Sequence, residues 1–473
     1  MTVETRSAAP VKDAVAALVR RARAAQAIAD GYDQARIDEL VAAAAWAILE
    51  PARNRELSEL AVRDTGIGDV EDKVLKNHRK TLGLLRDLHG LKTVGVISED
   101  KASGIVEIAR PVGVVCAVTP STNPAATPAN KIINSLKARN AVIVAPSPKG
   151  ATTCARLIAF IHAELDRVAA PRDLVQMLPA PITKEATAEL MRQCDLVVAT
   201  GSQANVRAAY ASGTPAFGVG AGNVASIVDE TADLDDAAAK IVQSKTFDNA
   251  TSCSSENSLV LVEAIAGPML AALVRQGCVP VSGEDRKRLE ACMWPEGKLS
   301  SAVIGQSAAA IAERAGLADP AARRARVLLV EESGTGPGHR FSGEKLSPVL
   351  TVYRVPDFAA AKDLVRRIYA YQGAGHSVSL HSKVDERALD LGLTLPVARV
   401  IVNQVHVVAN GGSFSNGLPV SLSMGCGTWG RNNFSDNLNV RQYMNVTRIS
   451  RPIPERVPTV DELLGDYFAR WGR

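Results

Sequence analysis

The chain has 473 residues, of which 47% are hydrophobic, 22% charged and 4% aromatic. This composition is typical of a folded globular protein and unlike that of disordered, collagen-like or coiled-coil chains. Its 54 basic and 50 acidic residues are interspersed and leave a net charge of +4, so the charge indicates neither nucleic acid nor a membrane as a partner. At about 100–200 residues per domain, the length predicts two or three domains and excludes a single-motif binding module.

The N-terminal sequence and the cysteines bear on the compartment. Residues 1–26 include Glu4 and Asp13 and contain no apolar block, whereas signal peptides need such a block and transit peptides avoid acids. The apolar run Leu40–Leu49 is shorter than the ~18–20 residues of a membrane span. The seven cysteines are an odd number without close spacing, so neither a disulfide framework nor a CxxC site is predicted. We therefore expect a protein of the reducing cytoplasm.

The predicted elements begin with a helical layer. From Ala9 to about Leu91 apolar residues recur with helical period. Strand-like apolar runs then alternate with helical segments, at Gly104–Val118, Ala141–Pro146 and Asp195–Gly201. This alternation predicts βαβ units and a parallel sheet.

A second α/β unit follows in the sequence. Further apolar runs at Ala225–Asp229, Ser258–Ala264, Ala325–Glu331 and Leu350–Val355 alternate with helical segments. No repeat, low-complexity tract or charged linker separates the two units. We expect them to pack tightly in a protein of the α/β class.

A candidate nucleophile precedes one of these strands. Cys253 lies among small polar residues in the string KTFDNATSCSSEN, and such a loop can stabilise a reactive thiolate. Considered alone, a free cysteine is more often a small buried apolar residue. Motifs elsewhere in the chain favour the nucleophile.

Five strings occur in a fixed order: TPSTNP, LVVATGS, the segment from FGVGAGN to SCSSE, EKLSPVL and SMGCGTWG. Together they resemble the CoA-acylating branch of the aldehyde dehydrogenase superfamily, over about residues 10–452. The resemblance implies a Rossmann-type cofactor domain over residues 1–226, with an oligomerisation strand at about 104–112. It further implies an α/β catalytic domain over 227–402 that carries Cys253. Residues 403–473 would return to the cofactor domain and form a C-terminal oligomerisation arm, in a homodimer or homotetramer.

The resemblance also implies a reaction. Cys253 would add to an aldehyde, hydride would pass to a nicotinamide cofactor, and a thioester would remain on the sulfur. Asn123 of TPSTNP matches the side-chain donor to the developing oxyanion, with the Cys253 N–H as second donor and Thr122 beside the substrate. From the residues alone, Asn123-Pro124 predicts only a turn.

The identity of the acyl acceptor is predicted from the absence of an acidic residue at one position. Hydrolytic relatives carry a general-base glutamate where this chain reads FGVGAGN, Phe217–Asn223. Water therefore lacks its base, and the thiol of CoA is expected to release the acyl group. The nearest acids, Asp229 and Glu230, are interpreted as helix-start residues.

The cofactor is expected at the carboxyl ends of strands. Thr200, Gly201 and Ser202 end a strand and begin a helix, where backbone N–H groups and the helix dipole can bind a pyrophosphate. No GxGxxG motif is present nearby. The run from Gly218 to Gly222 has the wrong spacing and follows no predicted strand, so Gly220 is expected to form a turn beside the nicotinamide.

Two further positions bear on the nucleotide. Ser147 and Lys149 follow the strand 141–146, where NAD-preferring relatives place an acid. A hydroxyl and an ammonium there favour NADP, with NAD also usable, although a solvated lysine at a helix start is nearly as good an interpretation. Glu344 of EKLSPVL matches the family's ligand for the nicotinamide ribose.

Two histidines are candidates for chemistry. His376 lies in a Gly-rich turn where acylating relatives carry a histidine, and an imidazole there can assist deprotonation of the CoA thiol. A structural, hydrogen-bonded role is the alternative. His406 follows a strand that resembles the one leading to the substrate pocket, so it is expected to line that pocket. No cluster has metal-ligand spacing, and no metal is expected.

The substrate class is predicted from the C-terminal string Ala409–Leu438. It resembles most the enzymes for short anionic aldehydes, sulfoacetaldehyde first and succinate semialdehyde next, with acetaldehyde and propionaldehyde third. Arg431 and Arg441 are candidate partners of a sulfonate or carboxylate, ordinary surface arginines being the alternative. The rival functions are a hydrolytic aldehyde dehydrogenase, a glutamyl-phosphate reductase-like enzyme and a non-catalytic scaffold.

Overall fold

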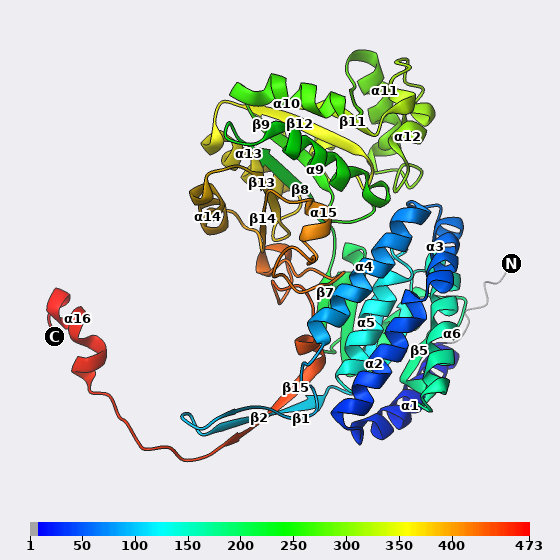
Figure 1. Cartoon of the computed structure of the whole chain (residues 1–473), viewed down its shortest axis with the longest axis vertical. Helices are drawn as coiled ribbons and strands as arrows, with labels where there is room; N and C mark the ends of the chain where they lie inside the picture. The colour runs from blue at the N-terminus through cyan, green and yellow to red at the C-terminus, as the bar shows by residue number, and fades with distance from the viewer. Residues whose placement is uncertain (1–7) are drawn as a thin grey trace.

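Four amphipathic helices form the N-terminal layer of the computed structural model, which describes residues 8–473 (Figure 1). Capping residues set where they begin and end. The Asp33 and Asp69 side chains accept backbone N–H groups at the starts of the second and fourth helix, and Gly66 ends the third at φ 67°. The helices are α1 Ala8–Asp30, α2 Gln34–Leu49, α3 Pro51–Thr65 and α4 Val70–Leu88.

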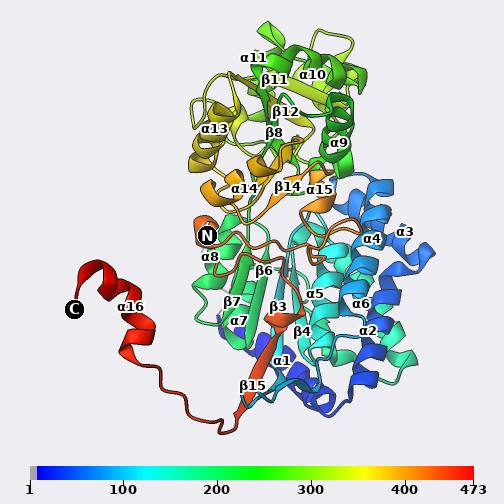
Figure 2. The same ribbon diagram turned by 60° about the vertical axis from the view of Figure 1, so that its left-hand side comes forward.

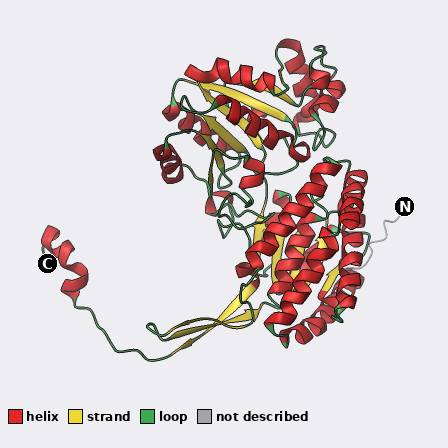
Figure 3. Cartoon of the chain, in the orientation of Figure 1, coloured by secondary structure: helices red, strands yellow, loops and turns green. Residues whose placement is uncertain are grey.

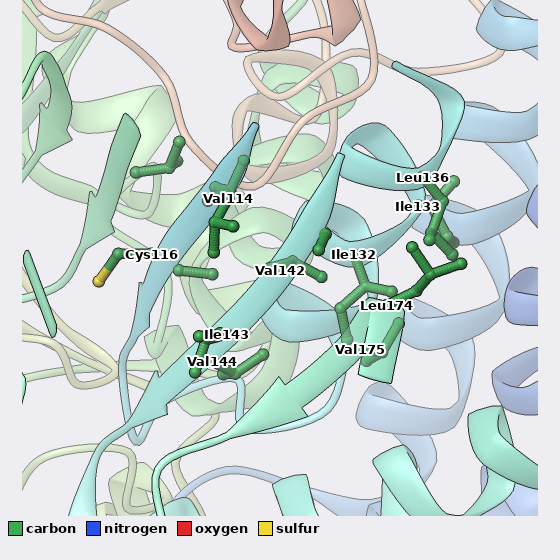
Figure 4. Close-up of a cluster of buried hydrophobic side chains, with 14 of the residues drawn as sticks. Val114, Cys116, Ile132, Ile133, Leu136, Val142, Ile143, Val144, Leu174 and Val175 are labelled. Carbon is green, nitrogen blue, oxygen red and sulfur yellow. The ribbon is translucent and has the colours of Figure 1, made fainter. Parts of the chain in front are cut away.

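The first α/β unit is a five-stranded parallel sheet of order β5-β4-β3-β6-β7. Its strands are β3 Val114–Thr119, β4 Ala141–Pro146, β5 Val175–Met177, β6 Leu196–Thr200 and β7 Ala216–Val219. The three central strands are apolar along nearly their whole length because helices cover both faces of the sheet. The connecting helices are α5 Ala126–Lys137, α6 Ala151–Arg167, α7 Lys184–Gln193 and α8 Gln203–Tyr210. Figure 4 shows valine and isoleucine side chains of β3 and β4 beside those of α5 and β5 in this core.

The second unit is a seven-stranded parallel sheet of order β10-β11-β12-β9-β8-β13-β14. Its strands are β8 Val224–Val228, β9 Glu256–Val262, β10 Cys278–Pro280, β11 Val327–Glu331, β12 Val349–Val355, β13 Val378–His381 and β14 Val400–Val402. Leu259 and Leu261 pack with α9 Leu234–Thr246 and α10 Glu263–Arg275 on one face. Val260 points to the other face, toward α13 Phe358–Tyr371 and α14 Asp385–Thr394. Helices α11 Gly283–Met293 and α12 Ala308–Ala315 pack near the β10 edge.

A three-stranded antiparallel sheet projects from the body of the molecule (Figure 1). Its strands are β1 Gly95–Asp100, β2 Ile105–Pro111 and β15 Met444–Ser450. The chain then runs through an extended segment into α16, Val460–Trp471, which contains no buried side chain. Figure 3 shows α16 standing apart from both α/β units. The arm is held to the body by the pairing of β15 with β2 and by Met444, which packs against the core of the first unit.

The predicted alternation of strands and helices is confirmed by the two parallel sheets, with one correction. The run Gly104–Val118 was expected from its composition to be one strand-like segment, but it divides into β2 and β3, which belong to different sheets, and β2 lies within the separate strand that the resemblance implied at about 104–112. The division falls at Gly113, which has φ 122°. A Cβ there would lie 2.4 Å from the Asp195 carboxylate, so only glycine fits at this turn.

Candidate active site

Cys253 lies in the loop between α9 and β9, partly buried, beneath the carboxyl end of the first sheet. Asp248, Asn249 and Ala250 precede it with φ between 49° and 58°, a strained left-handed run of the kind found at functional sites. Burial, with smaller contributions from Glu344 and Cys426, raises the pKa of the Cys253 thiol to about 12. At neutral pH the sulfur is therefore protonated and needs a base before it can attack.

A base is in place beside the sulfur. His376 Nε2 lies 3.3 Å from Cys253 Sγ, and the His376 side chain is buried. Burial, Arg399 and His406 lower the pKa of His376 well below its ordinary value, so the imidazole is neutral and can accept a proton. The structure thus brings together two residues that are 123 positions apart in the sequence.

Asn123 has a defined amide orientation. Its Oδ1 accepts a hydrogen bond of 2.8 Å from Lys76 Nζ. An ammonium can only donate, so the Asn123 Nδ2 remains as the free donor. Asn123 lines the same cavity as Cys253, so this Nδ2 can serve an oxyanion there.

A buried ion cluster, missed by the sequence analysis, ties α4 to both catalytic loops. Lys73 Nζ donates to the Thr122 carbonyl and to Asp248 Oδ2, each at 3.0 Å, and Lys76 also donates to Asp248. Burial would raise the pKa of Asp248, but Lys76 and Lys73 bring it below its ordinary value. The carboxylate therefore stays charged and anchors the strained loop before Cys253. In the sequence, the one feature that could have indicated this cluster is the spacing of Lys73 and Lys76, which are three residues apart and so lie on one face of a helix.

A cavity of about 540 Å³ at the carboxyl end of the five-stranded sheet collects most of the predicted residues. It is lined by Cys253, Asn123, Thr122, Ser147, Lys149, Thr200, Gly201, Ser202, Gly220 and Glu344, among others. Ser202 caps α8 by accepting the Asn205 N–H at 3.3 Å. The N-terminus of this helix therefore lies in the cavity wall, directly after Thr200 and Gly201. Ser147 and Lys149 lie at the end of β4, partly buried and exposed respectively.

The glycine run beside Cys253 has a steric cause. A Cβ on Gly222 would lie 2.3 Å from the Cys253 carbonyl oxygen, and one on Gly220 would lie 2.6 Å from the Gln203 side chain. The expectation that this run follows no strand was wrong, because β7 ends at Val219. With only four residues, β7 gives a weak strand pattern, and the glycine at position 218 lowers the signal further.

Glu344 is the one carboxylate that lines this cavity in the described part of the chain. Its Oε1 accepts the Gly222 N–H at 3.1 Å. Burial raises the pKa of Glu344 to about 8, while the Gly222 bond and the two lysines 245 and 345 oppose the rise. The pocket thus offers a carboxyl acceptor, the N-terminus of α8 and an exposed cation, and this set of groups fits the ribose and pyrophosphate of a dinucleotide.

A second cavity, of about 480 Å³, is lined by residues of α4, α9 and α15 (His406–Ala409). Figure 2 shows these three helices near one another. The second cavity shares Asn123, Ser252 and Lys80 with the first, so the two meet beside the nucleophile. Among the described residues its lining includes no carboxylate and four cations, namely Lys76, Arg79, Lys80 and Lys240.

The four cations differ in how far they are neutralised. Lys76 and Lys240 are paired with Asp248 and Asp236. Within residues 8–473 Arg79 makes no ion pair or hydrogen bond and stacks on the Phe414 ring, 5.4 Å from its centroid. Lys80 donates to the carbonyls of Gly411 and Gly412 at 2.9 Å and, more weakly, to a third carbonyl. Burial and the neighbouring cations lower the pKa of Lys80 to about 7.

Three predicted substrate residues lie elsewhere. His406 is buried behind His376 and lines neither cavity, because its ring turns toward Ser377. Arg431, at φ 58°, lines a third cavity beside Tyr210 and Trp429. Arg441 is exposed in the turn before β15 and lines none of these cavities. Arg431 and Arg441 lie in or just after the string Ala409–Leu438 from which the substrate was predicted, but neither lines the cavity that contains Cys253.

The described residues meet the requirements neither of a membrane-spanning helix nor of a metal site. No helix within residues 8–473 has the length and apolar character to span a membrane. Over the same range, no three His, Cys, Asp or Glu side chains are grouped in a way that would hold a metal ion.

Comparisons with known proteins agree with this geometry. The model of the aldehyde dehydrogenase family matches residues 2–284. A sulfoacetaldehyde dehydrogenase (acylating) from Cupriavidus necator is 68% identical over 98% of this chain and 94% of that protein. Another of the same description, from Bilophila wadsworthia, is 42% identical over 96% of this chain and 98% of that protein.

A solved structure supports the same assignment. The crystal structure of an acetylating aldehyde dehydrogenase from Geobacillus thermoglucosidasius matches with a TM-score of 0.91 at 34% identity, covering 96% of this chain and 100% of that one. The predicted fold class, a Rossmann-type cofactor domain with an α/β catalytic domain and a small arm, is thereby confirmed. The chain belongs to the aldehyde dehydrogenase family, in its CoA-acylating branch.

Proposed function

We propose that this enzyme oxidises a short anionic aldehyde, sulfoacetaldehyde in the first place, with CoA and NADP or NAD, to the acyl-CoA and the reduced cofactor. The observation that carries the substrate class is the second cavity, whose described lining residues include no carboxylate and the guanidinium of Arg79, which makes no ion pair within residues 8–473. An anion entering it gains charge-assisted hydrogen bonds and meets no like charge. The names of the relatives from Cupriavidus necator and Bilophila wadsworthia support the same substrate.

The first half of the reaction belongs to Cys253 and His376. His376 Nε2, 3.3 Å from the sulfur, takes the thiol proton as the sulfur attacks the aldehyde carbon. The Asn123 Nδ2 and the Cys253 N–H donate to the developing oxyanion. Loss of one such donor costs about 3 kcal/mol of transition-state stabilisation.

The dinucleotide would be held by the lining of the first cavity. Its nicotinamide, when bound, supplies the acceptor for the hydride that leaves the thiohemiacetal carbon. Thr200, Gly201 and Ser202 hold the pyrophosphate at the N-terminus of α8, Gly220 turns the chain beside the nicotinamide, and Glu344 accepts from the ribose. Ser147 and Lys149 favour a 2′-phosphate and hence NADP.

The second half transfers the acyl group to CoA. Glu344 is the single acid among the described lining residues and already accepts the Gly222 N–H, so an attacking water lacks a free carboxylate. The thiol of CoA, deprotonated by His376, attacks the thioester and releases Cys253. All seven cysteines are free thiols, which supports a reducing compartment such as the cytoplasm.

Omission of CoA tests this function. Wild-type enzyme mixed with sulfoacetaldehyde and NADP should release up to one equivalent of reduced cofactor per Cys253 and then stall, because the thioester persists. Addition of CoA should restart turnover and form sulfoacetyl-CoA, detectable by mass spectrometry. Cys253→Ala is the control that should show no burst. Steady release of free acid without CoA would contradict the acylating mechanism, and faster turnover of succinate semialdehyde or propionaldehyde would contradict the substrate.

A further inference from the structure

A chain of hydrogen bonds leads from the Cys253 sulfur into the protein interior. His376 Nε2 lies 3.3 Å from Cys253 Sγ, and His376 Nδ1 lies 2.8 Å from Ser377 Oγ. Ser377 Oγ in turn lies 2.9 Å from His406 Nε2. His376, Ser377 and His406 are at most 1% exposed, so no bulk water competes for these bonds.

The serine hydroxyl couples the two imidazoles, because it has one proton to donate. If Ser377 donates to His406 Nε2, its oxygen accepts from His376 Nδ1–H. The lone pair of His376 is then on Nε2 and faces the Cys253 thiol. One tautomer of His406 therefore sets the tautomer in which His376 can act as a base.

We propose that Ser377 and His406 form a proton relay behind His376, an inference that rests on the function proposed above. The Cys253 S–H bond breaks as an N–H bond forms on His376 Nε2. The proton on His376 Nδ1 passes to Ser377 Oγ, and the former hydroxyl proton of Ser377 passes to His406 Nε2. The result is a thiolate that accepts a hydrogen bond from a neutral His376 and a positive charge on His406, with no change in oxidation state.

The surroundings of His406 fit a site that holds a proton only briefly. Its Nδ1 is buried and has no hydrogen-bond partner among the described residues, so Nε2 toward Ser377 is its one bonded ring nitrogen. Burial, with smaller contributions from His381 and Arg399, lowers the pKa of His406 to about 3. When the thioester has formed, the proton returns along the same bonds to His376 Nε2 and leaves through the cavity that Cys253 lines, as the proton that oxidation of the aldehyde releases.

Alkylation of Cys253 tests the relay without substrate, cofactor or CoA. The rate at which iodoacetamide modifies Cys253, followed by peptide mass spectrometry, reports its thiolate as a function of pH. Ser377→Ala should move the midpoint upward by about one pH unit and lower kcat about 10- to 100-fold, with little change in KM. Ser377→Thr keeps the hydroxyl and should restore both quantities.

Two further variants complete the design. Ser379→Ala makes the same change two residues along the same segment, at a buried hydroxyl without a partner, and should leave both quantities at the wild-type value. His406→Gln can still accept from Ser377 but cannot take a second proton, so it should resemble Ser377→Ala. Thermal unfolding identifies any variant that fails to fold.

The relay is overturned if Ser377→Ala and His406→Gln, folded like wild type, show the alkylation profile and kcat of Ser379→Ala. It is also overturned if only KM changes. Failure of the proposed function gives a different result, since wild-type enzyme would then lack CoA-dependent aldehyde oxidation while the alkylation shift persisted.

Discussion

Cys253 and Lys149 are single residues whose roles were predicted from short motifs, and the structure places both on the wall of one cavity. Cys253 and Lys149 differ in their exposure to solvent. Cys253 is partly buried and its pKa is raised by burial, so its reactivity depends on the neighbouring His376. Lys149 is exposed, so whatever it contributes to nucleotide binding is weakened by solvent.

Replacement of Lys149 tests the preference for NADP. We expect Lys149→Ala to raise KM for NADP about 3- to 10-fold, because an exposed ammonium contributes modestly to binding a 2′-phosphate. KM for NAD should stay the same, since NAD has no phosphate at that position. Steady-state kinetics with both nucleotides measures this.

The matched control is Lys184→Ala, at an exposed lysine that begins α7 outside the cavity. It should change neither KM. Equal losses with both nucleotides for Lys149→Ala, or a clear preference of the wild-type enzyme for NAD, would contradict the assignment.

At the scale of elements, the sequence predicted those features of the site that depend on a short stretch of the chain. The string around Asn123 follows the carboxyl end of β3, whereas those around Cys253 and Glu344 precede the amino ends of the neighbouring strands β9 and β12. Parallel strands bring equivalent ends of one sheet to one edge, so the proximity of Cys253 and Glu344 could be anticipated. The contact of Lys76 with Asn123 could not, because it depends on how α4 docks against two loops that are distant in sequence. The placement of Arg431 and Arg441 away from Cys253 has the same cause, since hydrophobic periodicity carries no information on where a loop turns its side chains.

Arg79 of helix α4 is predicted to recognise the charge of the substrate. Arg79 lines the second cavity without an ion pair in the described part of the chain. We expect Arg79→Leu to lower kcat/KM for sulfoacetaldehyde about tenfold, because an unpaired guanidinium attracts an anionic substrate. The value for propionaldehyde, which is neutral, should stay within about twofold.

A neighbouring arginine on α4 provides the control. Arg86 stacks on the same Phe414 ring at the same 5.4 Å but does not line the cavity. Arg86→Leu should leave the ratio of the two substrates unchanged. A loss of equal size for both aldehydes in Arg79→Leu, or a rise in KM for CoA alone, would show that Arg79 does not select the anion of the aldehyde.

At the scale of the whole molecule, the arm is the part that a single chain leaves incomplete. Strands β1 and β15 are both edges of the three-stranded sheet, and such edges present unpaired N–H and C=O groups to another chain. Apolar side chains on the tail and α16 are exposed, with Val457 76%, Leu463 70% and Trp471 68% accessible. A folded chain rarely leaves such a surface in water unless a partner covers it, and we propose that a second copy of this chain does so in a homodimer or homotetramer.

Removal of the tail tests this assembly. Deletion of residues 452–473 leaves the pairing of β15 with β2 intact, so each chain should fold with an unchanged thermal midpoint for the body. The mass measured by light scattering should fall toward that of one truncated chain, which is below the 49.9 kDa of the full chain, because the apolar tail no longer docks on its partner. Leu463→Arg should weaken assembly in the same direction by placing a charge on the apolar face, while Asp466→Ala, at an exposed acid of the same helix, should leave the mass unchanged. A full-length chain that is already monomeric at micromolar concentration, or a truncated chain that keeps the full-length stoichiometry, would show that the exposed tail is not what joins the copies.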